Sequence, residues 1–77
     1  MTLELYYSKG CGYCRKVLKF MDQNGISIPL KDIHEDKNRE DLIRIGGMSQ
    51  TPCLMIDGKA MYESDDIIEW LKDNCKK

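Results

Sequence analysis

The chain has 77 residues and nearly balanced charge, with 12 lysines and arginines against 13 aspartates and glutamates and a net charge of −1. This length predicts one small domain over residues 1–77, with a thin core. The balanced charge argues against nucleic-acid binding, and no apolar run approaches the roughly 20 residues of a membrane span. The first residues lack the basic stretch and apolar run of a signal peptide, so we expect a cytoplasmic protein.

The first part of the chain predicts a strand, a helix and a second strand. Residues 2–7 alternate with a period of two, which is typical of a half-buried strand. From Cys11 onward, apolar side chains recur every three or four residues, which predicts an amphipathic helix that ends near residues 24–25. Residues 26–31 alternate again and predict a second strand. Pro29 favours an edge or a bulge there, because proline cannot donate a ladder hydrogen bond.

The middle of the chain predicts a short helix followed by a hairpin. Residues 36–45 predict a charged helix that stops at two glycines. The apolar run 52–56 predicts a buried strand, and the Asp57-Gly58 pair after it is a strong hairpin signal before a returning strand at 59–62. The short helix is expected to bury three apolar side chains, namely Leu42, Ile43 and Ile45.

A last helix completes an α/β domain. Ser64 is predicted to be its N-cap, with acidic residues in the first turn and Lys72, Lys76 and Lys77 near its C-terminal end, where each charge suits the helix dipole. The order β-α-β-α-β-β-α predicts a four-stranded mixed sheet flanked by three helices, in which the first two strands are parallel. The buried face of the last helix is expected to contain Ile67, Trp70, Leu71 and Cys75.

Four cysteines are many for a chain of this length. Cys11 and Cys14 are so close that a disulfide between them would close almost no loop and would stabilise the fold little. The pair lies where the first strand gives way to the first helix, which favours a dithiol redox motif. Unpaired N–H groups and the dipole at a helix start stabilise a thiolate, so we expect Cys11 to be an exposed thiol of depressed pKa. Cys14, on the apolar face, is expected to be the less exposed, resolving thiol.

Structural zinc is the main alternative for a Cys-x-x-Cys pair. A zinc site needs further ligands at suitable spacing, whereas Cys53, Cys75 and His34 are each isolated in the sequence. We therefore expect no metal ligands here. Cys53 and Cys75 are expected to be packing residues, and His34 a solvated loop residue.

The chain resembles the glutaredoxin family, which has the thioredoxin-like fold, over essentially its whole length. The resemblance implies a glutathione-dependent thiol–disulfide oxidoreductase that acts as a monomer on protein or small-molecule disulfides. Glutathione is then a co-substrate and not a bound cofactor. The segments that carry the resemblance are Tyr7-Ser8-Lys9, Cys11-Gly12-Tyr13-Cys14, Gln50-Thr51-Pro52, Ile56-Asp57-Gly58 and Ser64-Asp65-Asp66-Ile67.

The resemblance also implies a role for each site residue. Cys11 would be the nucleophile and Cys14 the resolving thiol. A cis Pro52 would face the Cys11 sulfur, and the Thr51 backbone would pair with the cysteinyl part of glutathione. The remaining contacts would place Ser64 and Asp65 at the γ-glutamyl end, Tyr13 beside the groove, and Lys9 near the glycyl carboxylate.

Three positions depart from the usual family pattern. Gly12 replaces a proline, and Lys9 lies two residues before Cys11 instead of three. Tyr62-Glu63 stands where the family often has two glycines, and Glu63-Ser64 is more similar to the corresponding step in the N-terminal domain of glutathione transferases. The first departure leaves open a [2Fe–2S] cluster held between two subunits by Cys11 and glutathione thiolates. A redoxin that is recharged by a thioredoxin-reductase-type flavoprotein is the other alternative.

Overall fold

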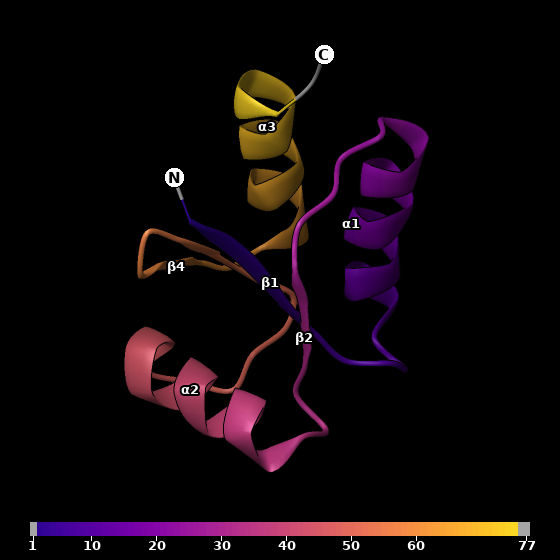
Figure 1. Ribbon diagram of the computed structural model, residues 1–77. Coiled ribbons are helices and arrows are strands. Elements are labelled where there is room, and N and C mark those ends of the chain that lie inside the picture. The colour runs from indigo at the N-terminus through magenta and orange to yellow at the C-terminus, as the bar shows by residue number, and fades with distance from the viewer. Residues whose placement is uncertain (1, 76–77) are drawn as a thin grey trace.

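The structure is a computed structural model that describes residues 2–75, and its element order is the predicted one (Figure 1). Lys76 and Lys77, which were expected to extend the positive end of the last helix, lie outside the described residues. No helix within residues 2–75 is long and apolar enough to cross a membrane. The elements are β1 (Leu3–Tyr7), α1 (Gly12–Gln23), β2 (Leu30–Asp32), α2 (Asp36–Gly46), β3 (Cys53–Ile56), β4 (Lys59–Met61) and α3 (Ser64–Asn74).

The four strands form one mixed sheet in the order β2-β1-β3-β4. β1 pairs with β2 in parallel and with β3 antiparallel, and β4 returns antiparallel beside β3. The hairpin between the last two strands turns at Asp57 and Gly58, whose φ angles of 51° and 84° suit a type I′ turn. This arrangement confirms the predicted four-stranded mixed sheet.

The sheet is covered on both faces, as Figure 1 shows, with α1 and α3 on one face and α2 on the other. Leu5 of β1 packs with Val17, Ile67 and Leu71 from the two helices on the first face. Tyr6, the next residue, points to the other face, where the smaller core cluster also contains Leu42, Cys53 and Met55. Burial of each large aliphatic side chain contributes about 1.5–3 kcal/mol, and the central strand contributes to both cores.

Two of the predicted elements differ in the structure. β2 begins only at Leu30, because Pro29 cannot donate to the ladder, although its carbonyl oxygen still accepts a 3.0 Å hydrogen bond from the Leu5 amide. The alternation that predicted a longer strand reflects burial of Ile28 in the first core. In α2 only Leu42 is buried. The expected burial of Ile43 and Ile45 is wrong, because both side chains are turned to solvent on this short helix.

The start of α3 also differs from the prediction. Ser64 is the first helical residue and not the N-cap, which is Glu63, with a φ of 68° and no side-chain capping bond. Along the helix, Ile67 and Leu71 are buried as predicted, while Trp70 and Cys75 are half-buried at the edge of the first core. The shift by one residue turns Ser64 inward and leaves Glu63 exposed at the entrance to the helix.

Candidate functional site

The site begins at the junction between β1 and α1. Cys11 is the N-cap residue of α1, with extended backbone angles, and its sulfur accepts a hydrogen bond from the Cys14 amide at 3.3 Å. At most helix starts a side-chain oxygen makes this bond, because the first N–H groups lack partners within the helix. Here a sulfur takes that position, at the positive end of the helix dipole.

The environment of Cys11 favours its thiolate. Burial would raise the pKa of the thiol, but hydrogen bonds from Cys14, Thr51 and Tyr13 outweigh it, so that the pKa of Cys11 is lowered. The side chain is half-buried, which keeps the sulfur accessible, although less so than the exposed thiol that was predicted. The lowered pKa agrees with the prediction from the helix start.

Cys14 lies one turn further along α1, in a different environment. Its side chain is 1% exposed, and burial raises the pKa of its thiol. The two thiols of the motif therefore differ in the predicted sense: Cys11 is the more acidic and more accessible of the two.

The loop before β3 lies against the Cys11 sulfur. The Thr51–Pro52 peptide bond is cis, as predicted. In its thiol form, the Cys11 sulfur donates a hydrogen bond to the Thr51 carbonyl oxygen at 3.7 Å. The fold thus brings together two segments that are separated by 40 residues in the chain.

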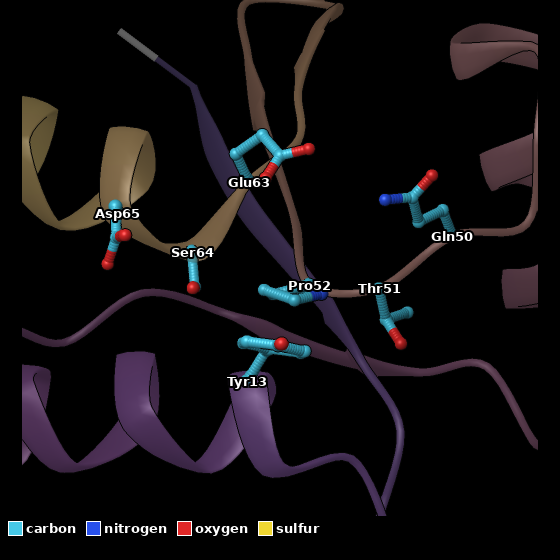
Figure 2. A pocket seen from close by; sticks show the side chains of 7 residues that line it. All are labelled: Tyr13, Gln50, Thr51, Pro52, Glu63, Ser64 and Asp65. Atoms are coloured by element: carbon cyan, nitrogen blue, oxygen red, sulfur yellow. The ribbon is translucent and has the colours of Figure 1, made fainter.

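An open groove of about 360 Å³ extends from this loop to the start of α3, and we call it the cis-proline groove. Figure 2 shows the Tyr13 ring below Pro52, with Ser64 and Asp65 at one end of the groove and Gln50 and Thr51 at the other. The amides of the first turn of α3 lack helical partners, because the first intrahelical bond runs from the Ile67 amide to the Glu63 carbonyl oxygen. The complete lining is Tyr13, Gln50, Thr51, Pro52, Glu63, Ser64 and Asp65.

Five of the predicted glutathione contacts line this groove, but Lys9 does not. The Lys9 ammonium lies 4.0 Å from the Asp32 carboxylate and lines a different depression on the surface. Its predicted contact with the glycyl carboxylate stays a prediction. The predicted contacts that the fold brings together are Tyr13, Thr51, Pro52, Ser64 and Asp65.

Sequence reasoning missed two residues of this region. Gln50 lines the groove, and its position beside Thr51-Pro52 was the signal that could have identified it. Lys16 forms a 2.5 Å ion pair with Asp65 and so links α1 to the start of α3. Lys16 lies one helical turn after Tyr13, on the same side of α1. The pairing with α3 could be found only from the packing of the two helices.

The other cysteines lie away from this chemistry. Cys53 is fully buried in the second core, and burial raises its pKa to about 11. Cys75 packs at the edge of the first core. All four cysteines are free thiols, and no group of three potential ligands for a metal ion occurs within residues 2–75.

Comparisons with solved structures and with protein families identify the fold and the family of this chain. The thioredoxin-like protein BC3987 has a TM-score of 0.78 and 25% identity, and the match covers 94% of this chain and 97% of that one. The chain thus has the thioredoxin-like fold, as predicted. Residues 5–76 match the family described as "Glutathione S-transferase, N-terminal domain", and the chain belongs to that family. The narrower glutaredoxin assignment is not confirmed.

Two similar proteins are longer than this chain. Glutathione transferase Omega 3C from Trametes versicolor is 27% identical with a TM-score of 0.82, and the match covers 95% of this chain and 33% of the transferase. Uncharacterized protein 030L of Invertebrate iridescent virus 3 is 29% identical over 96% of this chain and 54% of its own length. The chain therefore spans about half the length of the viral relative and a third of the transferase.

Proposed function

We propose that this domain is a glutathione-dependent thiol–disulfide oxidoreductase in which Cys11 is the nucleophile. The observation that carries the proposal is the position of the Cys11 sulfur. The sulfur accepts a hydrogen bond from the Cys14 amide at a helix start. It also contacts Thr51, which lines the cis-proline groove. A thiolate that is stabilised in this way and remains accessible is the species that attacks a disulfide.

The cis-proline groove supports glutathione as the co-substrate. The free amides at the start of α3 suit the γ-glutamyl carboxylate, and Asp65 suits the ammonium group beside it. The Thr51 backbone lies next to the Cys11 sulfur and would pair with the cysteinyl residue. The chain's family supports the same ligand class.

The proposed reaction has two half-reactions. The Cys11 thiolate attacks the glutathione sulfur of a mixed disulfide, the old S–S bond breaks, and the substrate leaves as a thiolate that takes a proton from water. A second glutathione thiolate then attacks the glutathione attached to Cys11 and releases glutathione disulfide and the Cys11 thiolate. In the dithiol route, Cys14 instead attacks the Cys11 sulfur, displaces the attached thiol and forms a Cys11–Cys14 disulfide, which two glutathione molecules reduce.

Turnover of a small glutathione mixed disulfide by the 77-residue chain, coupled to glutathione reductase, tests this proposal. We expect Cys11→Ser to reduce the rate to the uncatalysed background, because serine cannot form the mixed disulfide. Cys14→Ser should keep the monothiol route. Cys75→Ser removes a cysteine remote from the groove and is the matched control, which should keep the wild-type rate.

Four results would contradict all or part of the proposal. Absence of glutathione-dependent turnover would refute it, and turnover with thioredoxin reductase alone would support the flavoprotein-recharged alternative. Loss of activity in Cys14→Ser with the small mixed disulfide would contradict the proposed glutathione groove. Conjugation of glutathione to an electrophile that survives Cys11→Ser would indicate a transferase instead.

A further inference from the structure

A second groove lies beside Cys11, and we call it the basic groove. It is an open depression of about 360 Å³ that is lined by the end of β1, the loop after it and α1. Cys11 belongs to its lining and also contacts Thr51 of the cis-proline groove, so the reactive sulfur lies between the two. The basic groove is lined by Tyr7, Ser8, Lys9, Cys11, Arg15 and Leu18.

The two grooves carry charges of opposite sign. The cis-proline groove contains the carboxylate of Glu63 and that of Asp65, whose charge is partly offset by Lys16 at 2.5 Å. The basic groove contains the cations of Lys9 and Arg15 and no carboxylate in its lining. The two flanks of the Cys11 sulfur therefore present different electrostatic surfaces to a substrate, although the whole chain is close to neutral.

Arg15 is the cation of the basic groove that is available to a ligand. The charge of Lys9 is partly offset by Asp32, at 4.0 Å. In contrast, no carboxylate within residues 2–75 lies within 4.0 Å of the Arg15 side chain, which is exposed on α1. Guanidinium groups bind carboxylates with paired hydrogen bonds. Tyr7 and Leu18 add apolar surface to the same groove.

We propose that the basic groove binds an acidic polypeptide segment that carries the disulfide-bonded cysteine, while glutathione occupies the cis-proline groove. This inference rests on the proposed function, because it assigns the second half of the mixed disulfide to a place on the surface. The open shape of the groove suits the residues on either side of the peptide's disulfide-bonded cysteine, and the positive charge of the groove favours acidic residues there. The sign of the charge beside the sulfur then determines substrate preference.

The bonds change as in the first half-reaction. The Cys11 thiolate attacks the glutathione sulfur, the bond from glutathione to the peptide cysteine breaks, and glutathione becomes attached to Cys11. The peptide leaves as a thiolate, takes a proton from water and is released from the basic groove. A second glutathione thiolate then attacks the glutathione sulfur attached to Cys11, the Cys11–glutathione S–S bond breaks, and glutathione disulfide leaves with the Cys11 thiolate restored.

Two glutathionylated peptides of equal length test this inference, one with acidic and one with lysine residues on both sides of the same cysteine. We measure kcat/KM for each with the full chain at low and at high ionic strength. We expect the acidic peptide to react faster by about two- to fivefold at low salt, as exposed ion pairs allow. The preference should decrease at high salt because the charges are screened. Arg15→Glu should abolish or reverse it.

Lys59→Glu is the matched control, since it makes the same charge change on the exposed first residue of β4. It should keep the wild-type ratio between the peptides. Equal rates for the two peptides, or a ratio that Arg15→Glu leaves unchanged, would overturn the inference. Turnover of a mixed disulfide between glutathione and a small uncharged thiol separates this inference from the proposed function. If the wild type turns over that disulfide but does not distinguish the two peptides, only the basic-groove inference fails.

Discussion

Two cysteines three residues apart acquire different chemistry from their positions on one helix. Cys11 lies before the first turn, where backbone amides point at its sulfur, and Cys14 lies on the face of α1 that packs against the sheet. Hydrogen bonds outweigh burial at the first thiol, whereas burial dominates at the second. The helix start therefore favours the thiolate of Cys11, while burial favours the protonated thiol of Cys14.

This difference predicts an order of alkylation in the reduced chain. Cys11 should react first with iodoacetamide, and its rate should rise with pH around a midpoint below that of an ordinary cysteine, since its lowered pKa gives more thiolate at neutral pH. Cys53, which is buried and has a pKa of about 11, should react only after unfolding. Mass spectrometry of peptides at each pH measures both. Faster labelling of Cys14 or Cys53 than of Cys11 at neutral pH would contradict this assignment.

α2 has one buried residue, whereas α1 and α3 have three each. Only Leu42 of this helix is buried, so its attachment to the sheet depends on few side chains. At its C-terminal end, Gly46 approaches the ring of Tyr62, and the Tyr62 hydroxyl donates a 3.1 Å hydrogen bond to the Met48 carbonyl oxygen. A Cβ at Gly46 would clash with that hydroxyl.

We therefore expect Gly46→Ala to destabilise the domain by about 1–2 kcal/mol, because the new methyl displaces the Tyr62 ring and breaks its hydrogen bond. Urea denaturation measures the free energy of unfolding. In a Tyr62→Phe background the same substitution should cost less, since the clashing hydroxyl is gone, and the difference gives the coupling between the two positions.

Gly12→Ala is the control for this pair, because a Cβ at Gly12 lies in open space on α1. It should be neutral or slightly stabilising, as alanine generally is in helices. If Gly46→Ala changes the free energy of unfolding as little as Gly12→Ala does, the Tyr62 side chain does not limit the space at Gly46. The proposed anchoring of α2 would then be wrong.

The elements were predictable where one local pattern controls them, and less so where two compete. The hairpin at Asp57-Gly58 and the helix start at Cys11 follow directly from local chemistry. Residues 26–29 have the alternation of a strand but bury Ile28 without a full ladder, because Pro29 interrupts pairing. The exposure of Ile43 and Ile45 depends on how α2 lies on the sheet, which no local pattern encodes.

At the scale of the whole molecule, the sheet positions the candidate site. Cys11 follows β1, and the cis-proline lies in the loop before β3. Because β1 and β3 are antiparallel neighbours, the end of β1 and the start of β3 lie at the same edge of the sheet. The cysteine motif could be predicted from its spacing and its place at a strand-to-helix junction, whereas most of the groove residues followed only from the family resemblance. The separation of Lys9 from that groove, the Lys16–Asp65 pair and the opposite charges of the two grooves depend on tertiary packing.

The central claim is that glutathione binds in the cis-proline groove, beside the Cys11 sulfur. Titration of the ¹⁵N-labelled chain with S-methylglutathione tests it most directly by NMR, because this analogue binds without forming a disulfide. We predict saturable shifts of the amides of Tyr13, Thr51, Ser64 and Asp65, and weaker binding in Asp65→Lys, which would repel the γ-glutamyl ammonium. Absence of shifts, or shifts confined to residues of the basic groove such as Ser8 and Arg15, would contradict the claim.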